Sequence, residues 1–417
     1  MNMFLKIKCT LSFIARLTFA VSLIMLMSSS LSVRSEDNKL DGILSISNDS
    51  DKPSIPVSSV SFLPKPNISS KSWIIVDVNS EQVLAYSNPD LKVEPASLTK
   101  ILTAYLVFDA IEDKRLDTEQ NVIVSEKAWR TVGSRMFLEP NKKVSISELL
   151  QGMIVQSGND ASIVLAESVS GDEDSFVYLM NREAKKIGME SSSFTNVTGL
   201  PDPRHLTTAR DLSLLSISFL KKHESFLHYY KQKEFTFNGI TQPNRNRLLW
   251  SDPSVDGLKT GYTDTAGYCL VSTALRGDRR ILVVLLGANT EAIRTEESLR
   301  LLNWGFQNFD TLAMFEEKSS KSLEARVWEG VSDKINLRPK DPLWLSVPRG
   351  RAGDVKLIIE RIDPLIAPLY KDQIIGVLQF SIDNQILKTV KLRINSSINR
   401  AGLFGRVKDI IRRWFEH

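Results

Sequence analysis

A serine and a lysine three positions apart are the first residues in this sequence whose types and spacing could do chemistry. Ser97 and Lys100 lie just after Pro95 and lead into an apolar run from Ile101 to Val107. With no Gly or Pro until well past Ile111, the run predicts a helix that begins near Ser97. The two side chains then share a helix face, so the amine could take the hydroxyl proton. Alone, such a pair more often marks an N-cap serine followed by a surface lysine.

Two later segments change that interpretation. Ser157-Gly158-Asn159 begins 60 residues after Ser97, and Lys259-Thr260-Gly261 begins 102 residues after Ser157. The ordered set Ser-x-x-Lys, Ser-x-Asn, Lys-Thr-Gly resembles the signature of penicillin-binding proteins and serine β-lactamases. Chance is a poor explanation for all three in this order, so the sequence predicts one active site assembled from three distant segments.

Each polar residue of these segments has an expected role in acyl transfer. Ser97 is the predicted nucleophile, and Lys100 is the base, which must be neutral part of the time. Burial and a second cation nearby, Lys259, would both lower the pKa of Lys100. The Ser157 hydroxyl could relay the proton to the leaving amine, and the Asn159 carboxamide could position Lys100 and the substrate amide. Gly158 would permit an unusual backbone turn on the loop between them.

The third segment is expected to bind the substrate. Lys259 and Thr260 together suit a C-terminal carboxylate, and they lie on a predicted strand. Gly261 removes the side chain that would block a peptide from pairing alongside this strand. The backbone amides of Ser97 and Tyr262 could form the oxyanion hole, in which one donor is worth about 2.7–4 kcal/mol.

Composition narrows the remaining chemistry. The chain has 417 residues, with 42% hydrophobic and 24% charged, which indicates a globular protein of two or more domains. Its net charge of +4 lies mostly at the two ends, and this suits a membrane surface better than nucleic acid. Only Cys9 and Cys269 are present, and the four histidines show no metal-ligand spacing. We therefore expect no cofactor and no metal.

The ends of the chain indicate export and membrane contact. The basic start and the apolar run Leu17–Met27 are typical of a signal peptide, with an uncleaved N-terminal anchor as the alternative. Residues 34–70 are rich in Ser, Asp, Asn and Pro, which favours a flexible linker. The last 19 residues place Leu403, Phe404, Val407, Ile410, Ile411 and Trp414 at helical spacing among basic residues. A short basic amphipathic helix of this kind lies flat on an anionic membrane, with docking on the protein's own surface as the alternative.

The middle of the chain predicts an α+β fold. A β-hairpin at 72–86 precedes the Ser97 helix, short strands near 122–124 and 143–146 form an insert, and helices fill 160–190 and follow Thr207 or Thr208. Strands return at 255–259, 268–274 and 281–287, before a long helix with Leu299, Leu302 and Trp304. From about 318, short alternating runs predict a small all-β domain. The expected layout is a signal peptide (1–33), a linker (34–70), a transpeptidase-like domain of sheet plus helical cluster (71–317), a β-rich domain (318–396) and an amphipathic helix (397–417).

Residues 95–100, 149–161, 255–270 and 301–309 resemble low-molecular-mass penicillin-binding proteins, specifically the serine-type D-alanyl-D-alanine carboxypeptidases of bacterial envelopes. The resemblance spans roughly residues 70–417. It implies removal of the terminal D-Ala from peptidoglycan pentapeptide stems through an acyl-enzyme, acylation by β-lactams, and a location on the periplasmic side of the inner membrane. It also implies that Arg294 supports carboxylate recognition, although the alternative is a surface arginine on a helix. Many such relatives carry His where this chain has Tyr262, which leaves the role of that side chain open.

Three other functions share some of these features. A DD-endopeptidase that cuts cross-links would use the same site, although the C-terminal domain argues against it. A β-lactamase usually deacylates through a Glu in a Glu-x-x-Leu-Asn stretch, and none occurs between Ser157 and Lys259. A non-catalytic peptidoglycan-binding protein would be expected to lack Ser97 or Lys100, and both are present. The sequence therefore favours a carboxypeptidase.

Overall fold

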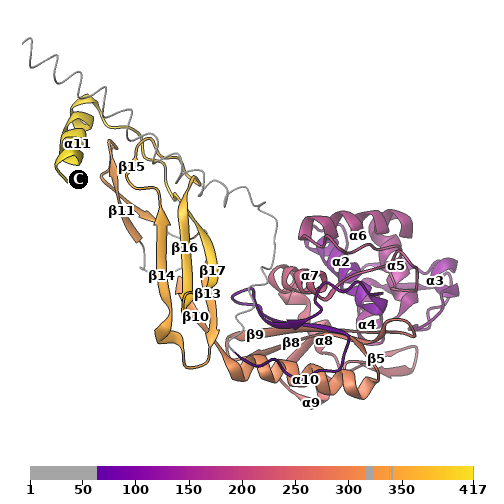
Figure 1. Ribbon diagram of the computed structural model, residues 1–417. Coiled ribbons are helices and arrows are strands. Elements are labelled where there is room, and N and C mark those ends of the chain that lie inside the picture. Colours follow the sequence, from indigo (N-terminus) through magenta and orange to yellow (C-terminus); the bar gives the residue numbers. More distant parts are fainter. Residues whose placement is uncertain (1–62, 316–322, 338, 340, 417) are drawn as a thin grey trace, which may run out of the picture.

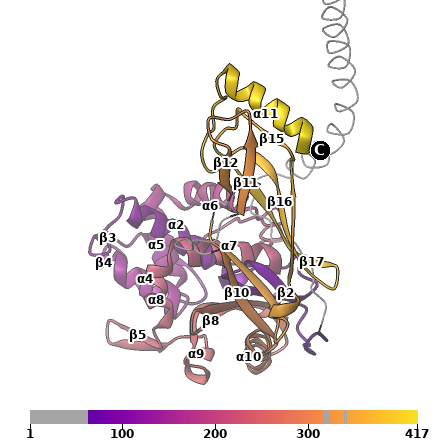
Figure 2. The ribbon, with the colours of Figure 1, turned by 90° about the vertical axis from the view of Figure 1, so that its left-hand side faces the viewer.

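The computed structural model describes residues 63–315, 323–337, 339 and 341–416. A catalytic domain of mixed helix and sheet joins an elongated all-β domain, and a helix, α11, lies at the far end of that domain (Figures 1 and 2). This is the predicted α+β catalytic domain followed by a β domain and a C-terminal helix. The predicted signal peptide and the first part of the predicted linker lie outside the described residues.

A five-stranded antiparallel sheet in the order β2-β1-β9-β8-β7 organises the catalytic domain. Its first hairpin and its last strand come from opposite ends of the domain, since β1 pairs with β9 with Ile75 opposite Val283. The strands are β1 (Ser72–Asp77), β2 (Gln82–Ser87), β7 (Val255–Thr263), β8 (Gly267–Arg276) and β9 (Arg279–Ala288).

The strands of this sheet are apolar at successive positions, which is the pattern of a sheet that is covered on both faces. Alternate side chains such as Ile74 and Val284 join the larger core with the helical cluster. Their neighbours, Ile75 and Val283, join a second core with Leu301 of α10 (Glu291–Asn308) on the opposite face. The sheet therefore holds β7, the strand of the Lys-Thr-Gly segment, rigidly between two layers.

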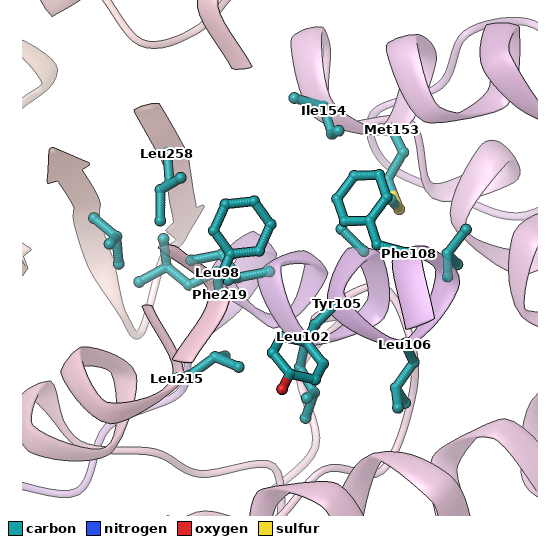
Figure 3. Packing of buried hydrophobic residues seen from close by; sticks show 14 of the residues in the cluster. Leu98, Leu102, Tyr105, Leu106, Phe108, Met153, Ile154, Leu215, Phe219 and Leu258 are labelled. Carbon is teal, nitrogen blue, oxygen red and sulfur yellow. The ribbon is translucent and has the colours of Figure 1, made fainter. Parts of the chain in front are cut away.

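Helix α2 (Lys100–Glu112) is the centre of the helical cluster. It is apolar almost all round, and ten of its thirteen residues are buried, as expected for a helix enclosed by others. Figure 3 shows Leu102 and Phe108 of α2 among Met153, Phe219 and other apolar side chains from surrounding segments. The surrounding helices are α3 (Glu126–Arg130), α4 (Ile146–Val155), α5 (Asn159–Ser170), α6 (Glu173–Ile187), α7 (Ala209–Lys222) and α8 (Leu227–Lys231), with a 3₁₀ turn η2 (Glu224–Phe226). Helix α9 (Leu248–Ser251) instead packs into the core on the other face of the sheet, with α10.

Two small two-stranded sheets lie outside the main sheet. Strands β3 (Asn121–Ile123) and β4 (Lys143–Ser145) pair, which confirms the predicted insert. Strands β5 (Glu234–Phe237) and β6 (Ile240–Pro243) form a hairpin next to the cavity described below.

The β domain begins earlier than the predicted boundary at residue 318. Strand β10 (Phe309–Phe315) pairs with β13 (Leu343–Pro348) rather than with the catalytic sheet. The start of β10 could not be predicted from the sequence, because β10 follows α10 directly and no turn residues separate them. The other elements are β11 (Leu323–Trp328), β12 (Lys334–Leu337), η3 (Ala352–Asp354), β14 (Lys356–Arg361), β15 (Leu365–Ile366), β16 (Ile374–Ile382) and β17 (Gln385–Arg393).

Specific polar contacts join the two domains. The buried Asp77 carboxylate accepts hydrogen bonds from Arg279 of the catalytic domain and from Thr311 of β10. Lys388 of β17 donates to the Ser80 carbonyl at 2.6 Å and to the Trp344 carbonyl at 3.2 Å. These contacts hold the β1–β2 turn against the β domain.

The last part of the predicted linker is attached to the catalytic domain. Residues 63–70 form no helix or strand, yet Leu63 and Ile68 pack against the core beneath α10. Both oxygens of the Glu297 carboxylate accept hydrogen bonds from Ser69 and Ser70. The prediction of a flexible linker is therefore wrong for residues 63–70. Leu63 and Ile68 pack against the core, and the Glu297 carboxylate, which is distant in sequence, binds Ser69 and Ser70.

Helix α11 (Leu403–Glu416) is amphipathic, as predicted, and its apolar side chains are exposed. Phe404 and Trp414 are 92% and 74% exposed. The helix is held to the β domain on its other side, where the Asp409 carboxylate accepts from the Glu329 amide at 2.8 Å. Within the described part of the chain, we find no helix with the length and hydropathy needed to cross a bilayer.

Candidate active site

Three of the predicted site residues meet at one end of α2. Ser97 lies in a 3₁₀ turn, η1 (Ala96–Thr99), and α2 begins at Lys100. The Lys100 Nζ lies 3.1 Å from the Ser97 Oγ and 2.7 Å from the Asn159 Oδ1. The structure thus brings together an alcohol, an amine and a carboxamide from segments about 60 residues apart.

The Lys100 amine has a third partner that the sequence did not indicate. It donates to the Thr198 carbonyl at 2.6 Å. A neutral amine has two N–H groups and one lone pair. If the Asn159 and Thr198 oxygens accept the two N–H groups, the lone pair faces the Ser97 hydroxyl. The geometry therefore suits proton transfer from Ser97 to Lys100.

The surroundings of Lys100 favour its neutral form. The pKa of Lys100 is lowered to about 7, first because burial disfavours the charged form and then because of the Arg245 guanidinium; Asp160 opposes the shift. The expected cause was burial together with the charge of Lys259. Burial is confirmed as the main cause. Arg245 is a cation that the sequence reasoning did not include, and Lys100 and Lys259 also interact, since the charge of Lys100 lowers the pKa of Lys259.

The loop carrying Ser157 is strained at the serine itself. Ser157 has a φ of +68°, while Gly158 has an ordinary negative φ, so the prediction that Gly158 makes the unusual turn is wrong. Gly158 is needed for space, because a Cβ there would lie 2.9 Å from Asp160 and 3.2 Å from the Gly152 carbonyl. The Ser157 Oγ is buried and has no hydrogen-bond partner among the described residues, which leaves it available to a ligand.

Strand β7 forms the opposite wall, as the sequence predicted. Lys259 and Thr260 are buried, at 3% and 5% exposure. The pKa of Lys259 is well below its usual value, mainly through burial and then through Lys100. A Cβ on Gly261 would lie 3.1 Å from the Pro95 carbonyl and 3.3 Å from Leu98. The glycine therefore lets β7 lie directly against the Ser97 turn, and this turn, rather than a peptide as predicted, takes the space that the missing side chain leaves.

A cavity of about 490 Å³ opens in front of these groups. Ser97, Ser157 and Thr260 line it, and so does Arg294, which is only 4% exposed. Arg294 is thus no surface arginine: its Nη2 donates to the Arg245 carbonyl at 3.2 Å, and its Nε is buried without a partner among the described residues. The cavity has the cationic lining that a carboxylate requires.

Arg245 is a cavity residue that the sequence reasoning missed. It lines the cavity together with Gln156, whose buried Nε2 has no partner among the described residues. No spacing signal links Arg245 to Ser97 along the chain. Only the tertiary structure reveals its role, since its charge acts through space to lower the pKa of both Lys100 and Lys259.

Tyr262 stands at the mouth of the cavity and is half exposed. Its ring packs 4.3 Å from that of Tyr268, its partner across β7 and β8, and its hydroxyl donates to Asp264 at 2.7 Å. These two contacts fix the orientation of the Tyr262 side chain, which forms part of the rim of the cavity.

A short loop holds the Thr198 carbonyl in place. The Asn196 Oδ1 accepts from the amides of Thr198, Gly199 and Leu200 at 2.7–3.2 Å. Gly199 has a φ of +87°, and a Cβ there would lie 1.8 Å from the Ala96 carbonyl. The sequence Asn-x-x-Gly is a turn signal that could have marked this loop, but nothing in it indicates a contact with Lys100.

His205 contacts η1, the turn that carries Ser97, through Thr99. Its Nε2 lies 2.9 Å from the Thr99 Oγ1. Burial lowers the pKa of His205 to about 4, so the ring is neutral at physiological pH. His205 is therefore a positioning residue rather than a base for Ser97.

One group of potential metal ligands lies elsewhere among the described residues. Asp109 and Glu112, near the C-terminal end of α2, flank the two ring nitrogens of buried His223 at 2.9 and 3.1 Å. Asp109 also pairs with Lys222. Each nitrogen faces a different carboxylate, and the Asp109 oxygen nearest His223 is also the one that pairs with Lys222.

Fold and site together define a serine acyl-transfer enzyme of the penicillin-binding protein class. The family model of D-alanyl-D-alanine carboxypeptidases (peptidase family S11) matches residues 59–290, and that of the C-terminal domain of penicillin-binding protein 5 matches residues 309–400. The chain therefore belongs to the serine-type D-alanyl-D-alanine carboxypeptidase family of low-molecular-mass penicillin-binding proteins.

Individual relatives agree with the family models. The chain is 40% identical to the D-alanyl-D-alanine carboxypeptidase DacC of Escherichia coli (strain K12), across 84% of this chain and 90% of that protein. It resembles the crystal structure of penicillin-binding protein 5 from Haemophilus influenzae with a TM-score of 0.78 and 36% identity, across 81% of this chain and 100% of that one. The ampicillin-bound form of penicillin-binding protein D2 from Listeria monocytogenes matches with a TM-score of 0.54 and 30% identity, across 59% of this chain and 100% of that one.

Proposed function

We propose that this chain removes the terminal D-Ala of peptidoglycan stem peptides through an acyl-enzyme on Ser97. The observation that carries the proposal is the set of three contacts made by the Lys100 amine, which leave its lone pair for the Ser97 hydroxyl. Lys100 accepts the Ser97 proton as the Oγ–carbonyl bond forms. The amides of Ser97 and Tyr262 are the proposed oxyanion donors.

Release of D-Ala requires a proton for the leaving amine. We assign its transfer to the Ser157 hydroxyl, because this group is buried, lines the cavity and has no partner among the described residues. The C–N bond of the tetrahedral intermediate then breaks, and the amine leaves as D-Ala. A water molecule attacks the acyl-enzyme by the reverse sequence of proton transfers, which frees Ser97.

Recognition of a free C-terminal carboxylate follows from the lining of the cavity. Arg245, Arg294 and Thr260 line it, and buried Lys259 lies beside Thr260 on β7. A carboxylate placed among these groups would receive charge-assisted hydrogen bonds in a partly desolvated site. The terminal D-Ala of a pentapeptide offers this carboxylate next to the scissile amide.

β-Lactams are the second proposed ligands. Their ring amide and carboxylate present the same two groups as the D-Ala-D-Ala terminus, and the listerial relative of known structure carries bound ampicillin. We expect the same Ser97 Oγ to form an ester with the opened ring.

The test is to incubate the chain with a pentapeptide, with a cross-linked peptide dimer and with a labelled penicillin, and to map the labelled peptide by mass spectrometry. We expect D-Ala from the pentapeptide and label on Ser97, with no activity or label in Ser97→Ala and full activity in the control Ser168→Ala. Preferential cleavage of the dimer would replace carboxypeptidase with endopeptidase. Label at another serine would overturn the assignment of Ser97.

We also propose that the chain is exported by its N-terminal signal peptide and attached to the periplasmic face of the inner membrane through residues 399–417. Exposed Phe404 and Trp414 on α11, beside Arg412 and Arg413, support the attachment.

Co-sedimentation with vesicles tests this attachment. We expect binding to vesicles that contain phosphatidylglycerol, and a roughly 30-fold weaker affinity for Arg412→Gln/Arg413→Gln, at about 1 kcal/mol for each basic residue. The control Lys186→Gln/Arg204→Gln, on the exposed surface of the catalytic domain, should bind as the parent does. Equal binding to neutral vesicles by all variants would contradict the electrostatic part.

A further inference from the structure

An apolar strand lies exposed at one edge of the β domain. Strand β14 is the outer strand of the sheet β14-β16-β17, and within the described residues nothing pairs with its other side. Its central residues Leu357, Ile358 and Ile359 are 38%, 46% and 41% exposed. Unpaired strand edges are usually short, charged or covered, because they can pair with other chains. This edge has three consecutive apolar residues instead.

Two of these side chains lie on the core face of the sheet. Leu357 is opposite Phe380 and Ile359 is opposite Leu378, and both partners on β16 are fully buried. Leu357 and Ile359 remain exposed because the core ends at this edge. A further strand at the same edge would cover them.

The backbone of β14 has a defined set of free groups. The Ile362 amide donates to the Ile375 carbonyl on the β16 side. In an antiparallel ladder, every second residue directs its N–H and C=O to the same neighbour. The backbone N–H and C=O groups of the even-numbered residues of β14 therefore point to β16. The backbone N–H and C=O groups of Leu357 and Ile359 point away from the sheet.

We propose that β14 pairs antiparallel with β14 of a second copy of this chain. Outward-facing residues lie opposite each other whenever the two-fold axis passes through a residue, and three such registers have the axis in the apolar centre of the strand, at residue 357, 358 or 359. With the axis at Ile358, Leu357 pairs with Ile359 of the other copy, and Lys356 lies opposite Glu360, twice. The other two registers separate Lys356 from Glu360. Opposite charges and apolar pairs directly across a strand pair are stabilising, so charge complementarity selects this register and a second copy as the occupant.

The charges on β14 do not protect this edge against self-pairing. Charged edge residues oppose self-pairing most strongly when like charges lie directly opposite each other. Lys356 and Glu360 are spaced symmetrically about Ile358, so a two-fold axis brings unlike charges together. A strand pair of this length buries less than the roughly 1,200 Å² of a small stable interface, so the dimer is weak and depends on concentration.

Antiparallel pairing fixes the orientation of the two copies. Strand β14 runs along the β domain between the catalytic domain and α11 (Figure 1). The two-fold axis reverses this direction, so the α11 helices lie at opposite ends of the dimer. Only one copy of a dimer could then rest on a given flat membrane through α11.

Sedimentation equilibrium of the full chain, in a non-ionic detergent that covers α11, tests the proposal without lipid. We expect a monomer–dimer equilibrium with a Kd on the order of micromolar or weaker. Ile358→Lys places two ammonium groups at the axis and should raise the Kd at least ~10-fold. The matched control is Ile386→Lys on β17, because Ile386 is 49% exposed at the other side of the sheet. A monomer at all concentrations, or equal loss in both variants, would overturn the proposal.

A charge exchange tests the register. Lys356→Glu and Glu360→Lys should each weaken the dimer, and the double variant should restore it. In a Cys9→Ser background, Ile358→Cys should form a disulfide-linked dimer in air, since directly opposite residues of this kind have Cα atoms about 4.5 Å apart. Ile386→Cys should not. Absence of the rescue, or a disulfide only at residue 386, would exclude this pairing.

Discussion

Lys100, which is buried, and Lys388, which is partly buried, are lysines in two different regions of the molecule. Burial lowers the pKa of both. Lys388 lies at the junction of the two domains and donates to two backbone carbonyls. Lys100 also contacts a carbonyl, but one of its partners is the hydroxyl of Ser97.

The difference shows what a lowered pKa can and cannot indicate. At Lys388 the partners are acceptors only, so the amine is confined to holding the β1–β2 turn against β13 and β17. At Lys100 one partner carries a proton that the amine can take. A perturbed lysine is thus evidence of catalysis only when a group with a transferable proton lies within reach.

The largest expected effect separates the two lysines by activity. Lys100→Met keeps most of the side-chain volume and removes the base, so we expect labelled-penicillin acylation to fall roughly 10²–10⁴-fold or more. Lys388→Met should acylate within about two-fold of the parent. Stopped-flow fluorescence measures both rates, with circular dichroism as the folding control. Comparable losses in the two folded variants would remove the distinction.

The pH dependence of acylation sharpens the assignment of Lys100. The base is active when neutral, so the acylation rate should rise with pH around a midpoint near 7, the pKa of Lys100. Arg245→Gln removes a cation that lowers this pKa, and the midpoint should then move to higher pH. Arg204→Gln, an exposed substitution, should leave it in place. A midpoint unmoved by Arg245→Gln would mean that another group titrates.

Stability should reveal the role of Lys388. Lys388→Met leaves the Ser80 and Trp344 carbonyls without this donor, and each unsatisfied buried acceptor costs about 1–3 kcal/mol. Solvent access at the junction would reduce the total. We expect a lower midpoint of urea unfolding, measured by tryptophan fluorescence, whereas Lys334→Met, whose partner Glu324 is exposed, should be near neutral. An unchanged midpoint for Lys388→Met would contradict the structural role.

The smallest expected effect concerns Tyr262. Tyr262→Phe loses the hydrogen bond to Asp264 but keeps the ring against Tyr268 and the backbone amide proposed as oxyanion donor. Acylation should change by less than about three-fold, since a hydrogen bond exposed to solvent contributes little. A loss of ten-fold or more, measured in the same assay, would give the phenol a direct part in the reaction.

Much of the scaffold was predictable because its signals are local. The apolar run after Ser97 predicted α2, and strands were also predicted at 255–259, 268–274 and 281–287, where β7, β8 and β9 lie. Thr208 was one of two predicted caps, and it is the N-cap of α7. The start of the β domain was missed, because β10 follows α10 directly and only its pairing with β13 shows where it belongs.

The sequence by itself determined which reactive groups this protein has and in what order, since the three motifs are read from residue type and spacing. Only the tertiary structure decided how those groups behave. The Thr198 carbonyl that orients Lys100, and the Arg245 charge that helps lower its pKa, come from segments about 98 and 145 residues away. Hydrogen bonds and burial depend on distance through space, and that distance is set when the sheet and the helical cluster close around α2.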